Sequence, residues 1–136
     1  MEEVTKTILI ADDEAPIRNL LTKVMRDQGL NILAASSGEE ALEISKSHPG
    51  AIHLLLTDIV MGKLNGKELA DIVCKERTDM RVVFMSGYPR DTVFENGVCH
   101  DKLFFLQKPF SFPAMVETVM DVLRMSPAEL GQPRHE

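Results

Sequence analysis

The stretch TILIADDE, residues 7–14, decides the fold of this chain of 136 residues. In it, five apolar or small residues, Thr7–Ala11, are followed at once by Asp12, Asp13 and Glu14. A short run that is apolar at nearly every position is typical of a strand buried on both faces of a parallel sheet. The sequence therefore predicts an interior strand that ends in a group of carboxylates.

Four more apolar runs follow, and segments with helical apolar spacing separate them. These runs are Asn31–Ala35, Ile52–Thr57, Arg81–Met85 and Leu103–Leu106. Helices are expected after Pro16 and after the capping residues Ser37, Asn65 and Ser111. The fourth helix is expected to be short or irregular, because residues 89–100 contain Pro, Asn and Gly and few apolar residues. Alternating strands and helices predict an α/β fold with a five-stranded parallel sheet and five helices.

Length and composition indicate one soluble domain, followed by a polar tail or linker over residues 126–136. The net charge of −6 argues against direct nucleic-acid binding, which needs a basic surface. No apolar run approaches the ~20 residues of a membrane-spanning helix, so no membrane insertion is expected. The first residues, MEEVTKT, lack the basic start and apolar stretch of a signal peptide, and a cytoplasmic location is expected.

Charged or hydroxylated side chains directly follow four of the five predicted strands. They are the pair Asp12-Asp13, Asp58, Ser86 and Lys108. Each alone has an ordinary explanation, as a helix cap, a turn residue or a solvated charge. In a parallel α/β sheet, however, the carboxyl ends of the strands meet at one edge, where ligands bind. All of these residues at one edge are harder to explain in that way.

The chemistry expected of this edge follows from its charge. Three carboxylates held together repel one another until a cation arrives. Mg²⁺ suits such a site, because it takes a few carboxylates, keeps waters and accepts phosphate oxygens. The pattern predicts phosphoryl transfer onto Asp58, with Lys108 offsetting charge on the phosphoryl oxygens.

The motifs ILIADDE, LLLTDIVM, NGKELA, VVFMSGY and FFLQKPF stand in the order and spacing of response-regulator receiver domains, which residues 5–125 resemble. The resemblance implies a flavodoxin-like, doubly wound sheet of order 2-1-3-4-5. It implies a signalling switch of a two-component phosphorelay rather than a metabolic enzyme. Such a domain takes a phosphoryl group from a sensor histidine kinase or a histidine phosphotransfer domain, and catalyses its own phosphorylation and dephosphorylation. The sequence Ser86-Gly87-Tyr88 resembles receivers attached to hybrid sensor histidine kinases.

The resemblance also assigns a role to each residue of the magnesium and phosphoryl site. Asp58 corresponds to the phosphoacceptor. Asp12 and Asp13 correspond to the acidic pair, with Asp13 as the direct metal ligand, and the backbone carbonyl of Val60 corresponds to a third metal contact. Lys108 corresponds to the phosphoryl-binding lysine, and the bond from Lys108 to Pro109 is predicted to be cis.

Further residues are expected to couple phosphorylation to a change of the surface and to set the rate of dephosphorylation. Ser86 corresponds to the hydroxyl residue that moves toward the phosphoryl group, and Phe105 to the aromatic switch. Together they are expected to change the surface around the fourth helix and fifth strand. The side chains of Val60 and Tyr88 are expected to flank the path of the hydrolytic water. Neither carries a carboxylate or amide that would orient this water well, which predicts slow self-dephosphorylation.

Three rival readings fit the sequence less well. A flavodoxin-like cofactor binder needs a phosphate-cradling loop after the first strand, where residues 12–14 would repel an anion. A phosphatase with an aspartyl nucleophile would carry that nucleophile at the end of the first strand, together with a cap for which no segment is left. An interaction module with a degenerate site is disfavoured because every catalytic position is filled. Binding of beryllofluoride in the presence of Mg²⁺ distinguishes the receiver from the cofactor binder and from the degenerate module.

Overall fold

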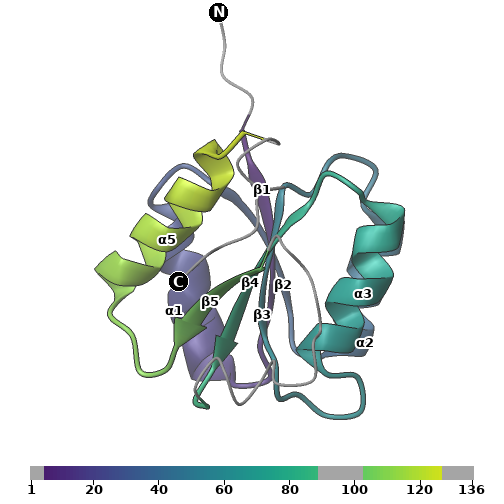
Figure 1. Cartoon of the computed structure of the whole chain (residues 1–136), viewed down its shortest axis with the longest axis horizontal. Coiled ribbons are helices and arrows are strands. Elements are labelled where there is room, and N and C mark those ends of the chain that lie inside the picture. The colour runs from purple at the N-terminus through teal and green to yellow at the C-terminus, as the bar shows by residue number, and fades with distance from the viewer. Residues whose placement is uncertain (1–4, 89–102, 127–136) are drawn as a thin grey trace, which may run out of the picture.

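A computed structural model describes residues 5–88 and 103–126 of the chain. Its centre is a sheet of five parallel strands (Figure 1). In chain order the strands are β1 (Thr7–Ala11), β2 (Asn31–Ala35), β3 (Leu54–Asp58), β4 (Arg81–Ser86) and β5 (Leu103–Gln107). Their order across the sheet is β2-β1-β3-β4-β5, with every neighbouring pair parallel. The predicted strand order is confirmed.

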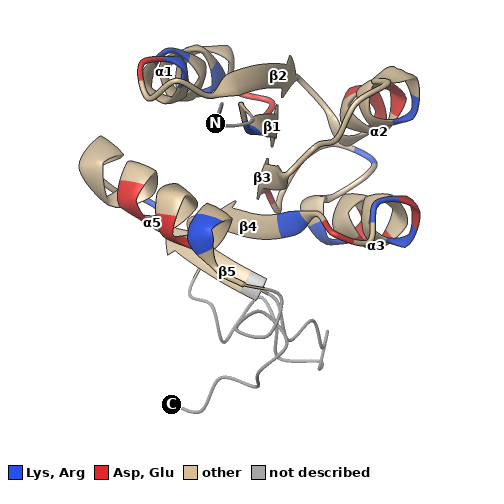
Figure 2. Cartoon of the chain, turned by 90° about the horizontal axis from the view of Figure 1, so that it is seen from above, with Lys and Arg blue, Asp and Glu red and all other residues tan. Residues whose placement is uncertain are grey.

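Helices cover both faces of the sheet. They are α1 (Ala15–Arg26), α2 (Gly38–Ser47), α3 (Gly66–Glu76) and α5 (Phe112–Arg124). Helices α1 and α5 cover one face and α2 and α3 the other, so that the strands form a middle layer (Figure 2). The described residues thus hold four helices, and the segment in which a short fourth helix was predicted lies outside them. Within the described part, no helix is long and apolar enough to cross a membrane.

The core consists of two clusters, because successive strand residues face opposite sides of the sheet. Toward α1 and α5, the buried strand residues are Ile8, Ile10, Ile32, Leu54, Leu56, Val83, Met85, Phe104 and Leu106. Toward α2 and α3, they are Leu9, Ala11, Ala35, Leu55, Val82 and Phe84. A slip of one residue in the pairing would exchange the two sets, so the packing of the helices fixes the register. This register also fixes which residues emerge at the carboxyl edge.

Side chains at the predicted caps begin three of the helices. The Ser37, Asn65 and Ser111 side chains each accept a hydrogen bond from the backbone N–H three residues later. The capping box is complete at Asn65, whose own N–H donates to the carboxylate of Glu68. At α2, by contrast, the Glu40 carboxylate accepts from the N–H and hydroxyl of Ser36. Glu40 therefore ties α2 to the end of the preceding loop.

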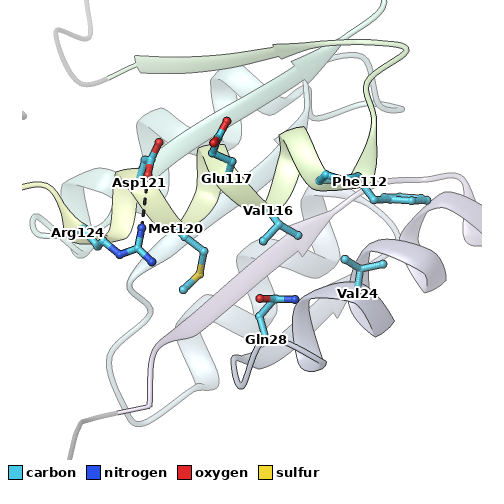
Figure 3. A pocket seen from close by; sticks show the side chains of 9 residues that line it. Val24, Gln28, Phe112, Val116, Glu117, Met120, Asp121 and Arg124 are labelled. Carbon is cyan, nitrogen blue, oxygen red and sulfur yellow. Dashed lines mark hydrogen bonds and ion pairs between the residues drawn. The ribbon is translucent and has the colours of Figure 1, made fainter.

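A groove of about 590 Å³ runs between α1 and α5 (Figure 3). The sequence predicts Leu20 and Phe112 on the inner faces of these helices, but they are 47% and 36% exposed. The sheet contacts of α5 are instead made by Met115, Val119 and Val122, so its apolar stripe is wider than the sheet can cover. None of the predicted site residues lines this groove.

Strand β3 begins at Leu54, two residues later than the apolar run predicts. The ring of His53 explains the later start, because its Nδ1 accepts the backbone N–H of Thr7 at 2.9 Å. The ring thus takes a donor of β1 that a backbone carbonyl would otherwise accept, although the N–H of His53 still donates to the Thr7 carbonyl and its carbonyl accepts the N–H of Arg81. Burial, followed by the charges of Lys6 and Arg81, lowers the pKa of His53. The folded chain therefore favours the neutral ring, which keeps Nδ1 as an acceptor.

We expect the stabilisation that His53 provides to be lost in weak acid, when its ring becomes protonated. A lowered pKa in the folded state means that its stabilisation is present above the unfolded value of 6.5. It is lost as the pH falls through the folded value. Denaturant titrations of the native protein and His53→Gln from neutral to weakly acidic pH should show their difference in unfolding free energy shrink by about 1 kcal/mol, the worth of one hydrogen bond. His48→Gln serves as the control. A difference independent of pH would contradict the assignment.

Candidate functional site

Four strand ends bring the predicted site residues to one edge of the sheet. Asp12 follows β1, Asp58 is the last residue of β3, Ser86 is the last of β4, and Lys108 follows β5. The register pairs Asp58 with Met85, so that Ser86 lies one residue beyond it on the neighbouring strand. The backbone N–H of Lys108 donates to the carbonyl of Ser86 at 2.7 Å. The edge predicted from the apolar runs is therefore present.

Asp12 is fully buried, and its backbone N–H, its backbone carbonyl and one of its two carboxylate oxygens are hydrogen-bonded. Its N–H donates to the carbonyl of Ala35 at 3.1 Å, and its own carbonyl accepts from the Arg18 guanidinium at 2.9 Å. Its Oδ1 accepts the N–H of Glu14 at 2.9 Å. The remaining oxygen, Oδ2, is buried and has no hydrogen-bond partner. A fixed carboxylate with one unsatisfied buried oxygen is costly unless a ligand completes it.

Lys108 is the cation of the site. Its Nζ donates to Oδ2 of Asp58 at 2.9 Å and lies 3.8 Å from Oδ2 of Asp12 and from Oε1 of Glu14. Asp58 is only 7% exposed, so this contact is shielded from solvent. The peptide bond from Lys108 to Pro109 is cis, as predicted.

Glu14 joins the site, although the sequence analysis treats it only as a charge that repels anions. Carboxylate oxygens of Asp12, Glu14 and Asp58 lie within 4.8 Å of one another. Asp13 is exposed and is not part of this group, so its direct ligation of a metal stays a prediction. The position of Glu14 gave a usable signal, because it is the third acid of the run and directly precedes α1. Formally, three carboxylates and one ammonium sum to −2, which one divalent cation would neutralise.

The pKa directions agree with this crowding of charge. Burial raises the pKa of Asp12, and the charges of Asp58 and Glu14 add to that rise. The hydrogen bond from Glu14 N–H and the charge of Lys108 offset part of it. For Lys108, burial alone would lower the pKa, but the hydrogen bond and charge of Asp58, with Asp12 and Glu14, raise it overall. These surroundings therefore stabilise the cationic form of Lys108, whereas they destabilise the charged form of Asp12.

The loop between β3 and α3 is packed tightly against Asp58. A Cβ atom on Gly66 would lie 2.2 Å from the carbonyl oxygen of Asp58 and 3.0 Å from Cα of Ile59, so only glycine fits. The N–H of Gly66 donates to the Ile59 carbonyl at 2.8 Å. Both ends of the loop that carries Val60 are therefore fixed near the predicted phosphoacceptor. The Val60 side chain itself is 61% exposed.

The predicted switch residues lie on neighbouring strands. The Ser86 hydroxyl is buried, and its Oγ accepts the N–H of Tyr88 at 3.0 Å. Phe105 pairs with Phe84 in the register and is half-buried against the cluster under α2 and α3. The Tyr88 side chain is 60% exposed beside this edge. The movements expected of Ser86 and Phe105 stay predictions.

Several known proteins are similar to this chain in sequence or in structure. The sensor kinase CckA of Brucella abortus is 32% identical over 117 residues, which cover 86% of this chain. The chain spans only 12% of the length of that kinase. Among solved structures, a response regulator receiver protein from Sinorhizobium medicae WSM419 has a TM-score of 0.78 and 32% identity, covering 88% of this chain and 94% of that one.

A second solved structure carries a ligand. It is the response regulator TrrA of Thermotoga maritima in complex with Mg(2+)-BeF, with a TM-score of 0.73 and 29% identity, covering 87% of this chain and 99% of that one. The response regulator receiver domain family matches residues 8–120 of the present sequence. With the fold and the acidic edge described above, this match shows that the chain belongs to the response regulator receiver domain family.

Proposed function

We propose that the domain accepts a phosphoryl group on Asp58 from a phosphohistidine, in a reaction that depends on Mg²⁺. The observation that carries this proposal is the contact of Asp58 with Lys108 beside Oδ2 of Asp12, which has no hydrogen-bond partner. A nucleophilic carboxylate, a cation for phosphoryl oxygens and an open position for a metal are thus adjacent. The donor would be a sensor histidine kinase or a histidine phosphotransfer domain, as membership of the receiver family supports.

The residues present fit a magnesium ion. Oδ2 of Asp12 is buried without a hydrogen-bond partner, and carboxylate oxygens are the ligands that Mg²⁺ prefers. Glu14 and Asp58 complete the group, and the backbone carbonyl of Val60, in the loop that packs on Asp58, would be a further contact. The Mg(2+)-BeF complex of the similar TrrA structure supports this choice of metal. When bound, the ion would offset negative charge on the phosphoryl oxygens.

The residues of the chain supply positioning and charge. A carboxylate oxygen of Asp58 forms the bond to phosphorus while the bond from phosphorus to the donor imidazole nitrogen breaks. The electron pair of the broken bond stays on that nitrogen. Lys108, now 2.9 Å from Asp58, would pass its hydrogen bond to a phosphoryl oxygen. The Ser86 hydroxyl could donate to another, since Oγ at present acts as an acceptor from Tyr88.

The phosphorylated domain would act as a switch and not as a metabolic enzyme. Movement of Ser86 toward the phosphoryl group would leave space that Phe105 could fill, and so alter the surface around β5. Both residues lie in or at the end of paired strands, which supports a coupled movement. Loss of the phosphoryl group by hydrolysis would reset the switch.

We predict that Asp58 is the sole phosphorylation site. Incubation with a small phosphodonor and Mg²⁺ should add the mass of one phosphoryl group to the native protein, as measured by intact mass spectrometry. Asp58→Asn should abolish this addition, because the amide cannot attack phosphorus as a carboxylate does. The exposed Asp79→Asn serves as a control and should be labelled like the native protein. Full labelling of the Asp58 variant at another residue would rule out the assignment.

Removal of the Asp12 charge should stabilise the metal-free protein at neutral pH. The pKa of Asp12 is raised above its usual value of 3.8, so its contribution to stability is greatest below that value and is lost as the pH rises through the folded value. Asp12→Asn should therefore unfold at higher denaturant concentration than the native protein at neutral pH, with a smaller advantage in acid. Added Mg²⁺ should reverse the order. An Asp12 variant that is less stable at neutral pH without metal would show that the cluster is structural.

The exposed side chains of Val60 and Tyr88 should set the lifetime of the phosphorylated state. We predict slow self-dephosphorylation, because Val60 offers no polar group to orient water and Tyr88 is large enough to shield the phosphorus. Val60→Asn and Tyr88→Ala should each lose the phosphoryl group faster, by about tenfold for one well-placed water contact. Rates come from the decay of the phosphorylated mass after the donor is removed. If neither substitution speeds the decay, the explanation fails.

A further inference from the structure

The start of α2 contributes no residue to the carboxylate cluster, yet it is linked to both loops that form the site. We call residues 36–40, from Ser36 to Glu40, the α2 turn. One link runs from Ser36 through Ala35 to Asp12, whose carbonyl also accepts a hydrogen bond from Arg18, and the other runs from Gly38 to the loop after β3. We propose that the α2 turn is a positioning element that holds the two loops in the geometry required for the metal.

The first link is polar. The Arg18 guanidinium donates to the backbone carbonyl of Asp12 at 2.9 Å. The Glu40 carboxylate is held by the N–H and hydroxyl of Ser36, and it also feels the charge of Arg18. Ser36 directly follows Ala35, whose carbonyl accepts the N–H of Asp12 at 3.1 Å, so the α2 turn is joined to the residue whose Oδ2 has no hydrogen-bond partner. The Asp12 backbone is thus held at its N–H by Ala35 and at its carbonyl by Arg18.

The second link is steric. A Cβ atom on Gly38 would lie 2.6 Å from the carbonyl oxygen of Leu64 and 3.0 Å from its Cβ. Leu64 belongs to residues 59–65, the loop that carries Val60 and is fixed to Asp58 through Gly66. Because the nearest atom is backbone, an added methyl group could not be accommodated by a side-chain rotation. The α2 turn thus packs directly on the main chain of the loop over residues 59–65.

Loss of Arg18 distinguishes positioning from simple electrostatics. Arg18 is a cation near the acidic cluster, so Coulomb's law alone predicts that its removal would tighten Mg²⁺ binding. A positioning role predicts the opposite, because Asp12 would lose the partner of its carbonyl. Removal of groups that orient metal ligands commonly weakens metal affinity by about 10–100-fold. We expect about a tenfold loss for Arg18→Met and for Gly38→Ala, with a smaller loss for Arg18→Lys.

Titration calorimetry of the metal-stripped full chain with Mg²⁺ tests the inference. Each variant has a matched control: Arg26→Met removes an exposed cation from the same helix, and Gly62→Ala adds a methyl group to the same loop, where no atom lies within 4 Å. The controls should bind Mg²⁺ like the native protein. Unfolding free energies without metal should show that the variants remain folded. Arg18→Met combined with Glu40→Gln should weaken binding by less than the sum of the two single effects if the residues act as a unit.

The inference rests on the proposed function, and the experiment separates the two. Failure of the native protein to bind Mg²⁺ and beryllofluoride would overturn both. Native binding together with unchanged or tighter binding by folded Arg18→Met and Gly38→Ala would overturn only the role of the α2 turn. Should one of these two variants fail to fold, the other decides the outcome through its own link. An equal loss of affinity in Gly62→Ala would also count against the steric link.

Discussion

Repulsion between buried carboxylates is the constraint on which the rest of this structure depends. Asp12 and Asp58 lie at the ends of adjacent strands in the middle of the sheet, where neither can turn its charge fully toward solvent. Lys108 relieves part of this repulsion, but its contact with Asp58 is closer than its contacts with Asp12 and Glu14. The fold therefore keeps an anionic site that is incomplete by itself, and its hydrogen bonds hold the carboxylates in place rather than letting them separate. This repulsion would favour the binding of a cation.

Main-chain packing transmits this arrangement to the neighbouring helices. At Gly38 and Gly66 the first residue of a helix touches a backbone carbonyl so closely that no side chain fits. Side chains can adjust by rotation, whereas backbone contacts of this kind move only with the whole segment. The loop that carries Val60 is thereby held between α2 and α3. The positions of the loop backbone near Asp58 thus depend on two glycines, Gly38 and Gly66, which carry no functional side chain.

The sequence was sufficient to predict the sheet, its strand order and the edge at which Asp12, Asp58, Ser86 and Lys108 meet. The sheet and this edge follow from nearly continuous apolar runs and from the polar residues that end them, whereas the strand order was implied by the resemblance to receiver domains. What could not be predicted depends on rotamers. Glu14 turns toward Lys108 while its neighbour Asp13 stays outside the cluster, although both are acids in the same run.

Two further departures from the sequence prediction, the start of β3 at Leu54 and the exposure of Leu20, also have tertiary causes. A ring nitrogen of His53 replaces a backbone acceptor, and a helix can carry more apolar residues than the sheet covers. Both outcomes are decided by three-dimensional contacts rather than by the period of the sequence. The segment over residues 89–102 lies outside the described structure, so the predicted fourth helix stays a prediction.

Charge also determines how the site would change once Asp58 is modified. In the resting state Asp12, Glu14 and Asp58 carry three negative charges, and Lys108 carries one positive charge. Phosphorylation would replace the charge of Asp58 by a phosphoryl group of about −2, so the formal sum would become one charge more negative. The modified site would then hold a divalent cation more strongly and attract any nearby hydrogen-bond donor. The Ser86 hydroxyl is such a donor, and its turn toward the phosphoryl group would alter its contact with the N–H of Tyr88. Tyr88 is therefore linked through its backbone to a group that would respond to an added charge on Asp58.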